Sequence, residues 1–223
     1  MLPRHIFLDL DGTLFHSEED IRYAWRLTLD ELKLGCPQFE RTFRVGPSLK
    51  SMAEMLFPGR GLQDKIIPVF KRYYDASSLP NTLPYPGVDG WLRGLAASGH
   101  LLYTLTNKRL APTEMLVRRY GWWNLFVDVV GSDSFGQFPL SKADMLRFML
   151  ERFSIRPADA AMVGDTPEDV RAGREAGVFT VACSWGYSSV DDLRKAEPDS
   201  MIFPSDILDR DKTDKTLHGG TTR

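Results

Sequence analysis

The feature that most constrains the fold is an apolar run that ends at two closely spaced aspartates. Ile6-Phe7-Leu8 is typical of a buried strand, and Asp9-Leu10-Asp11-Gly12-Thr13 follows it at once. In open α/β sheets, ligands bind outside the carboxyl ends of the strands. The two carboxylates therefore stand where a reacting acid and a second acid would be placed. A surface turn is the plain alternative, since Asp-Gly is a common turn dipeptide and Asp often caps a helix.

Size and composition indicate an ordinary globular protein. The chain has 223 residues, of which 43% are hydrophobic and 26% charged, with a net charge of -2. This balance gives no case for a nucleic acid or an anionic membrane as partner. No run approaches the roughly 18 apolar residues of a membrane span. The two cysteines, Cys36 and Cys183, form no disulfide or metal framework, and no signal-peptide pattern precedes the first strand, so we expect a cytoplasmic protein.

Short apolar runs alternate with helical patterns along most of the chain. The expected buried strands are Ile6–Leu8, Leu101–Leu105, Phe126–Val130, Ala160–Val163 and Phe179–Ala182. The expected helices are Val88–Ala97, Thr113–Tyr120, Lys142–Phe153 and Pro167–Ala176. Thr166 is placed to cap the last of these helices, and Pro167 suits its first turn. The alternation predicts an α/β fold with a doubly wound, Rossmann-like parallel sheet.

Residues 16–83 interrupt this alternation. They contain no convincing strand, but they show helical patterns over Asp20–Leu34, Leu49–Leu56 and Gln63–Ala76. We expect an all-helical cap domain, residues 16–83, inserted into a catalytic core formed by residues 1–15 and 84–208. Because the insert begins directly after the aspartate loop, a lid that excludes water is favoured over a plain packing layer. The polar tail, residues 209–223, is expected to be disordered.

Two further segments carry groups that could bind an anion. Thr106-Asn107-Lys108 follows the second core strand, where a hydroxyl and backbone N–H groups can bind phosphate oxygens, although an ordinary turn would look the same. Lys142 begins a helix after a polar loop. A helix N-terminus is an unfavourable place for a cation, so a specific anionic partner explains this lysine better than solvent does.

A third acidic segment follows the fourth expected strand. Gly164-Asp165-Thr166-Pro167-Glu168-Asp169 places Asp165 at the strand end and Asp169 one helical turn later. Taken alone, Asp165 could be a helix-start acid stabilised by the macrodipole. Together with Asp9 the two acids form an oxygen-rich set of the kind that Mg²⁺ prefers, and packing three acids together without a cation would be costly.

These motifs occur in an order that resembles one family over nearly the whole core. They are Asp9–Leu14, Leu105–Lys108, Lys142 and Val163–Asp169. They resemble the haloacid dehalogenase-like hydrolase superfamily, in particular its phosphoglycolate-phosphatase-like branch with a small helical cap. Val45–Leu49 is similar to the cap loop of that branch. Trp185-Gly186-Tyr187, after the fifth expected strand, also resembles members of the branch. Lys142-Ala143 departs from the Lys-Pro that many relatives carry.

The resemblance implies a Mg²⁺-dependent phosphatase that acts through an aspartyl-phosphate. Asp9 would be the nucleophile, and Asp11 would protonate the leaving alcohol and then activate water. Mg²⁺ would be held by Asp9, the backbone carbonyl of Asp11, and Asp165, with Asp169 binding directly or through water. The implied partner is a small phosphorylated metabolite, with phosphoglycolate the leading candidate, and the implied state is a monomer or dimer.

The same resemblance assigns the groups that would hold the substrate. Thr106, Asn107 and Lys142 would bind the phosphoryl oxygens. In the cap, Arg44 and Lys50 are candidates for pairing with a substrate anion, and solvated surface charges are the alternative.

Several other functions stay open at this point. Pyrophosphate or nucleotide monophosphates could be the substrate, and a phosphomutase of the β-phosphoglucomutase type would use the same core. A dehalogenase is disfavoured because Asp11 is present. A phospho-receiver domain also combines acids, Thr and Lys on a doubly wound sheet, but it lacks such an insert. An inactive binding protein is disfavoured because no motif residue is missing.

Overall fold

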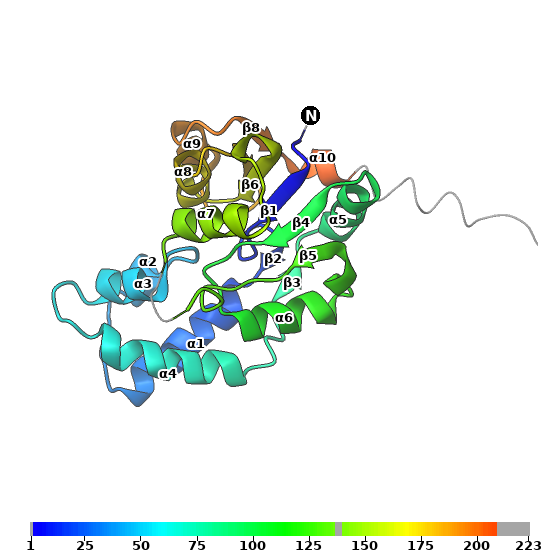
Figure 1. Ribbon diagram of the computed structural model, residues 1–223. Coiled ribbons are helices and arrows are strands. Elements are labelled where there is room, and N and C mark those ends of the chain that lie inside the picture. The colour runs from blue at the N-terminus through cyan, green and yellow to red at the C-terminus, as the bar shows by residue number, and fades with distance from the viewer. Residues whose placement is uncertain (1, 137–139, 209–223) are drawn as a thin grey trace, which may run out of the picture. The chain divides into compact units, whose positions relative to one another are not determined.

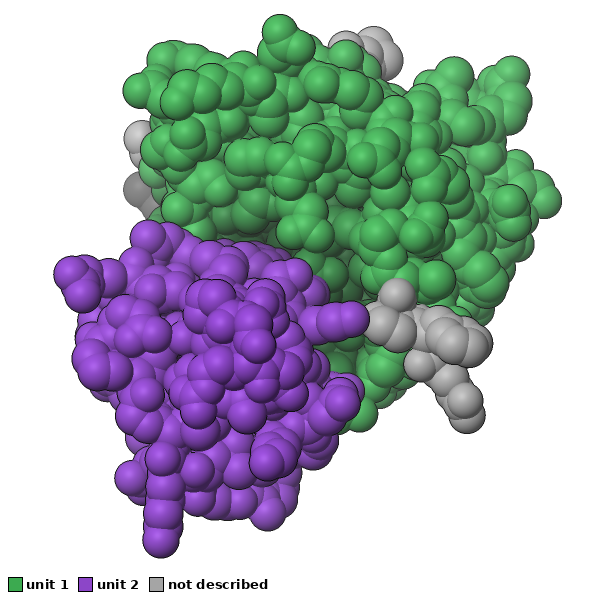
Figure 2. Space-filling view, turned by 90° about the vertical axis from the view of Figure 1, so that its left-hand side faces the viewer, with its two compact units in different colours: residues 1–14, 84–223 green, residues 15–83 purple. Residues whose placement is uncertain are grey.

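The computed structural model describes residues 2–136 and 140–208 of the chain. They divide into two compact units, which Figure 2 distinguishes by colour. Residues 15–83 form one unit, and the described residues before and after them form the other. The tail at 209–223, for which disorder was expected, lies outside the described residues.

The larger unit is built on a six-stranded sheet with the order β5-β4-β1-β6-β7-β8, in which all neighbouring strands are parallel. Its strands are β1 (His5–Leu8), β4 (Leu101–Thr104), β5 (Phe126–Asp128), β6 (Ala160–Gly164), β7 (Phe179–Cys183) and β8 (Ser200–Ile202). The chain runs outward from β1 through β4 to β5, returns to β6, and then runs outward the other way. The direction of winding therefore reverses between β1 and β6, which is where such sheets bind ligands. The predicted doubly wound α/β fold is confirmed.

Helices lie on both sides of this sheet, as Figure 1 shows, with α7 and α8 on one side and α5 and α6 on the other. The bounds are α5 (Val88–Ala97), α6 (Leu110–Arg119), α7 (Lys142–Arg152), α8 (Pro167–Glu175), α9 (Val190–Lys195) and α10 (Pro204–Leu208), with short 3₁₀ turns at Trp123–Leu125 and Pro157–Asp159. A sheet covered on both faces needs continuous apolar strands. Ile6, Phe7 and Leu8 are accordingly all fully buried. No helix among the described residues has both the length and the apolar character needed to cross a membrane.

Several element predictions for this unit need correction, and helices α9 and α10 were not predicted. A sixth strand, β8, was missed because it is a three-residue, half-buried edge strand with little apolar signal. Helix α6 begins at Leu110 rather than Thr113. Its first turn is capped from a distance, because Asp133 Oδ1 accepts a hydrogen bond from the Leu110 N–H at 2.7 Å. A partner 23 residues away leaves no local start signal in the sequence.

The smaller unit is mainly helical. Its elements are β2 (Phe15–His16), α1 (Glu18–Glu31), α2 (Phe39–Thr42), α3 (Leu49–Leu56) and α4 (Gln63–Ala76), and it ends at β3 (Leu83–Pro84). The prediction of an insert without strands is wrong in this detail, because β2 and β3 pair where the chain enters and leaves the unit. Helices α1 and α4 pack together, with the Trp25 and Phe70 ring centroids 5.0 Å apart.

A buried aspartate joins the beginning and the end of this unit. Asp20, only 5% exposed on α1, accepts hydrogen bonds from the backbone N–H and side-chain amide of Asn81 and from the Thr82 hydroxyl, at 3.0, 3.1 and 2.7 Å. A buried carboxylate is stable only when its oxygens are satisfied in this way. The contact therefore fixes the returning chain against α1.

Candidate active site

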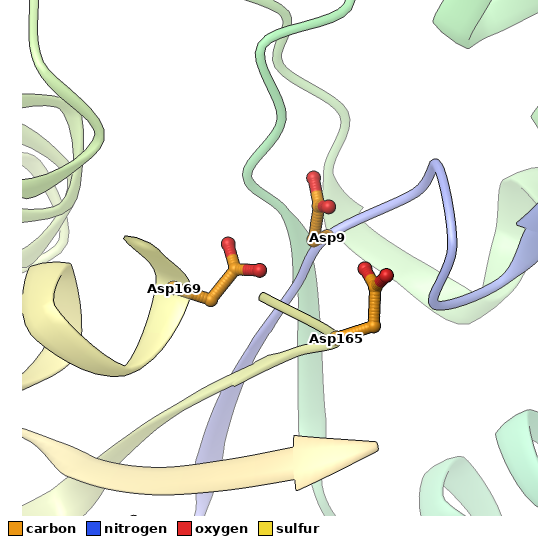
Figure 3. A group of neighbouring side chains, drawn as sticks. All are labelled: Asp9, Asp165 and Asp169. Atoms are coloured by element: carbon orange, nitrogen blue, oxygen red, sulfur yellow. The ribbon is translucent and has the colours of Figure 1, made fainter. Parts of the chain in front are cut away.

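Three buried acids meet at the reversal point of the sheet. Asp9 follows β1, Asp165 follows β6, and the two strands are parallel neighbours with Leu8 paired to Val163. Asp169 lies in the first turn of α8. One carboxylate oxygen from each acid lies within 4.8 Å of the other two, and all three residues are buried. Figure 3 shows the three side chains, from three different elements, arranged around one common space. The acids predicted to form one cluster are thus brought together.

Asp169 is fixed by the start of its own helix. Thr166 and Asp169 form a capping box, in which the Thr166 hydroxyl accepts a hydrogen bond from the Asp169 N–H at 3.2 Å. In return, Asp169 Oδ2 accepts hydrogen bonds from the N–H and hydroxyl of Thr166 at 3.0 and 2.6 Å. The predicted cap at Thr166 is confirmed. The box leaves Asp169 Oδ1 directed to Lys142, whose Nζ lies 2.5 Å away.

Asp165 is held by two loops that approach it closely. Its Oδ1 accepts a hydrogen bond from the Thr13 hydroxyl at 3.2 Å, and its Oδ2 accepts one from the Tyr187 N–H at 2.7 Å. A Cβ atom on Gly12 or on Gly186 would lie 2.2 Å from an atom of Asp165. Only glycine fits at these contacts, so the loop after β7 is shaped around this carboxylate. No local pattern in the sequence connects Tyr187 to Asp165, so this contact was not predicted.

Lys142 is the cation that faces this cluster. It begins α7, as the sequence predicted, and Ser141 is the N-cap of this helix. Its Nζ lies 3.1 Å from Asp9 Oδ1 as well as 2.5 Å from Asp169 Oδ1, and its side chain is 4% exposed. An anionic partner was expected for Lys142 because it begins a helix. The structure provides two, the carboxylates of Asp9 and Asp169.

Burial and mutual repulsion shift the ionisation of these groups. Burial raises the pKa of Asp9 to about 7, with Asp169 and Asp11 adding to the rise and Lys142 opposing it. Burial and the charges of Asp169 and Asp9 raise the pKa of Asp165 well above its usual range. Burial would lower the pKa of Lys142, but the neighbouring carboxylates, Asp169 foremost, outweigh burial and raise it.

The residues present fit a divalent cation. When all three buried carboxylates are ionised, the one ammonium beside them leaves two negative charges uncompensated. A buried charge is costly unless it is paired or coordinates a metal. The donor set consists of oxygen atoms only, which suits a hard ion such as Mg²⁺.

Two of the predicted phosphate-binding residues, Thr106 and Asn107, lie at the end of the neighbouring strand β4. β4 is parallel to β1 on the side opposite β6, with Leu8 paired to Thr104, so Thr106 and Asn107 follow the strand next to Asp9. Thr106 is buried, and its hydroxyl accepts a hydrogen bond from the Lys108 N–H at 3.2 Å. The Lys108 Nζ lies 2.9 Å from Asp11 Oδ1. Lys108 lies within the Leu105–Lys108 motif, but no function was predicted for it from the sequence.

The two predicted cap residues belong to the other unit. Arg44 and Lys50 are both exposed there, with Lys50 on α3. Arg44 Nη1 donates a hydrogen bond to the Phe43 carbonyl oxygen at 2.7 Å. Both are cations on the surface of residues 15–83, and neither is among the buried residues of the acidic cluster.

Comparison with known proteins identifies the family. The family model for "Haloacid dehalogenase-like hydrolase" matches residues 6–183. A phosphoglycolate phosphatase from Aquifex aeolicus is 31% identical over 209 residues, covering 92% of this chain and 95% of the relative. One from Rhodospirillum rubrum is 33% identical over 199 residues, covering 84% and 82%.

Solved structures agree. A haloacid dehalogenase-like family hydrolase from Streptococcus pneumoniae has a TM-score of 0.80 at 26% identity, covering 97% of this chain and 99% of its own. A predicted phosphatase from Clostridium acetobutylicum has a TM-score of 0.84 at 24% identity, which bears on the fold alone. The chain therefore belongs to the haloacid dehalogenase-like hydrolases, and the predicted family is confirmed.

Proposed function

We propose that this chain is a Mg²⁺-dependent phosphatase that hydrolyses a small phosphorylated metabolite of the phosphoglycolate type through an aspartyl-phosphate. The observation that carries the proposal is the buried cluster of Asp9, Asp165 and Asp169 with Lys142 at the reversal point of the sheet. The family and the relatives named phosphoglycolate phosphatase support the same reaction.

Asp9 and Asp11 perform the covalent steps in this proposal. An Asp9 carboxylate oxygen forms a bond to phosphorus while the bond to the leaving oxygen breaks, and Asp11 gives that oxygen its proton. Water then gives a proton to Asp11 and attacks the same phosphorus, while the bond between phosphorus and the Asp9 oxygen breaks. This step releases inorganic phosphate and restores the Asp9 carboxylate. Lys142 lies against Asp9, so it reduces the repulsion between this carboxylate and an incoming phosphoryl group.

The metal site in this proposal consists of Asp9, the backbone carbonyl of Asp11, and Asp165. Asp169, whose oxygens also accept hydrogen bonds from Lys142 and Thr166, binds the ion directly or through water in this proposal. When bound, Mg²⁺ shields the negative charges of carboxylate and phosphate from each other. Thr106, Asn107 and Lys142 bind the phosphoryl oxygens.

The test is a screen of the purified protein with Mg²⁺ against phosphorylated metabolites, with phosphate release as the readout. The panel holds phosphoglycolate, pyrophosphate, nucleoside monophosphates and sugar phosphates. A strong response to phosphoglycolate supports the proposal in full, and a response to pyrophosphate or nucleotides corrects the substrate. An isomerised sugar phosphate without release would make the protein a mutase. No reaction from folded, Mg²⁺-bound protein would contradict the proposal.

Selectivity is proposed to depend on the helical unit, and Arg44 tests this. Arg44→Ala is expected to raise KM for the metabolite identified by the screen several-fold, because a guanidinium can pair with a second anionic group of the substrate. KM for p-nitrophenyl phosphate, which lacks that group, should change less. Lys50→Ala tests the second candidate in the same way. Arg41→Ala, at another exposed arginine of this unit, is the control, and equal effects on both substrates would contradict the role of Arg44.

Two finer expectations stay predictions within this proposal. Cytoplasmic location fits the two free cysteines, Cys36 and Cys183, and cell fractionation checks it. A monomer or dimer is expected, and size-exclusion chromatography with light scattering distinguishes the two.

A further inference from the structure

A second buried lysine lies in the site, and the proposed reaction gives it no role. The Lys108 side chain is 1% exposed, and its Nζ lies 2.9 Å from Asp11 Oδ1, whose side chain is 14% exposed. An ammonium group is rarely buried so fully unless it has a specific anionic partner. The lysine is therefore built into the interior next to the acid that the reaction uses twice.

The backbone of Lys108 is fixed on both sides. Its N–H donates to the Thr106 hydroxyl at 3.2 Å, and its carbonyl oxygen accepts a hydrogen bond from the Ser132 N–H at 2.8 Å. These contacts attach it to the residues after β4 and to the loop after β5. The ammonium group thus extends from a hydrogen-bonded backbone position to the loop after β1, which carries Asp11.

The oxygen of Asp11 that faces this ammonium is also buried. Among the residues that the structure describes, Asp11 Oδ1 accepts no hydrogen bond of good geometry. Its close contact with Lys108 is an ion pair whose angles are not those of a hydrogen bond. Lys108 is accordingly the charged group that lies against this oxygen, whereas the other lysine, Lys142, lies against Asp9 and Asp169.

We propose that Lys108 is a positioning residue, whose ammonium holds the Asp11 carboxylate in the orientation needed to transfer a proton to the leaving oxygen. The inference rests on the proposed function, because it needs Asp11 to act as acid and base. A misplacement of about 1 Å in a reacting group can cost on the order of 100-fold in rate. Losing the restraint should therefore slow the reactions in which Asp11 must deliver a proton.

The decisive experiment compares two leaving groups in wild type and Lys108→Met. The alkoxide of phosphoglycolate needs a proton as it leaves, whereas p-nitrophenolate leaves without one. We expect kcat/KM for phosphoglycolate, or for the alkyl phosphate that the screen identifies, to fall about 10- to 100-fold. We expect kcat/KM for p-nitrophenyl phosphate to fall by less than about 3-fold, because this ratio reports only the steps up to release of the leaving group. Equal losses on both substrates would overturn the positioning role.

A double-mutant cycle with Asp11→Asn adds a readout that a merely structural lysine would not change. If Lys108 acts through Asp11, Lys108→Met should cause no further loss in the Asp11→Asn background. Multiplying losses would overturn the inference. Lys195→Met removes an exposed lysine that also pairs with an aspartate, and it should leave both substrates unaffected.

Two further measurements keep the outcome clear. If Lys108→Met does not fold, as judged by thermal unfolding, Lys108→Arg retains the charge and should keep more alkyl phosphate turnover than Lys108→Gln; equal losses in the two would overturn the proposal. Wild type that hydrolyses neither substrate would remove the proposed function itself. Wild type that is active, with no leaving-group difference in the variants, would remove only the role of Lys108.

Discussion

The acidic cluster of the larger unit and the ion pairs around Glu40 in the helical unit place charge in opposite environments. In the larger unit, Asp9, Asp165, Asp169 and Lys142 are at most 4% exposed. In the helical unit, Glu40 pairs with Arg22 and Arg26 through side chains that are 58%, 22% and 58% exposed. Buried ion pairs often lose more in desolvation than they gain in attraction, and exposed pairs contribute little either way. A concentration of buried charge is therefore poor evidence for stability and good evidence for chemistry.

The difference shows in ionisation. Burial, not a partner's charge, is the main cause of the raised pKa of Asp9. For Glu40 the main cause is a hydrogen bond from Arg26, and the shift is downward. Folding thus makes ionisation of Asp9 in the larger unit less favourable, whereas it makes ionisation of Glu40 on the surface of the helical unit more favourable.

Asp9→Asn should have the largest effect and should separate activity from stability. We expect turnover to be abolished, because an amide cannot form the aspartyl-phosphate. The pKa of Asp9 rises from 3.8 to about 7 on folding, so between about pH 4 and 7 the folded chain holds a proton that the unfolded chain has lost. Stability of the metal-free protein should therefore fall as pH rises through this window.

Asn cannot ionise, so the variant should escape this loss. At pH 8 without Mg²⁺, its Tm should exceed that of wild type, by about 2–4 °C for each kcal/mol recovered. Calorimetry at pH 5 and pH 8 checks the sign, and the gain should shrink at pH 5. A lower Tm at pH 8 would contradict the claim that ionisation of buried Asp9 destabilises the protein. Substantial residual hydrolysis would remove Asp9 as nucleophile.

Gly186→Ala should weaken metal binding although it replaces none of the carboxylates. The added Cβ would lie 2.2 Å from the Asp165 Cβ, so the aspartate or the loop must move. Changes in groups that orient metal ligands typically cost 10- to 100-fold in affinity, and we expect a loss of about that size for Mg²⁺ in a calorimetric titration. Gly35→Ala is the control, because nothing lies within 4 Å of its added Cβ. Unchanged affinity would show that the loop after β7 does not set the position of Asp165.

Asp20→Ala tests whether the contribution of a charged group to stability depends on its burial and not on the unit in which it lies. This acid lies in the helical unit, yet it is buried and accepts three hydrogen bonds from Asn81 and Thr82. Removing an acceptor from buried donors costs about 1–3 kcal/mol, and we expect a loss of stability of that order in urea unfolding with Mg²⁺ present. Asp30→Ala, at an exposed site on the same helix, is the control and should have little effect. Equal losses would contradict the burial argument.

The sequence predicted the features that depend on residues close together in the chain. The apolar runs predicted five of the six core strands, and the acids at their ends predicted the cluster, because parallel strands bring their carboxyl ends to one edge. What it missed depends on contacts between distant segments. Asp133 caps α6, Tyr187 holds Asp165, and Lys108 lies against Asp11 only after folding. The edge strand β8 was missed for a different reason, since three half-buried residues carry too little pattern.

Glu40→Gln should have the smallest effect, although it removes the acid of two close ion pairs. Arg22 Nη1 and Arg26 Nη2 lie 2.6 and 2.8 Å from its oxygens, and these arginines lower the pKa of Glu40. Water and salt screen such exposed pairs, and ordering the long side chains offsets the attraction. We expect no resolvable change in Tm at physiological ionic strength and at most a small decrease at low salt. Activity on p-nitrophenyl phosphate should be unchanged. A fall in Tm as large as that of Asp20→Ala would mean that the exposed network of this unit is stabilising as a set, and burial would then no longer separate the two kinds of charge in this protein.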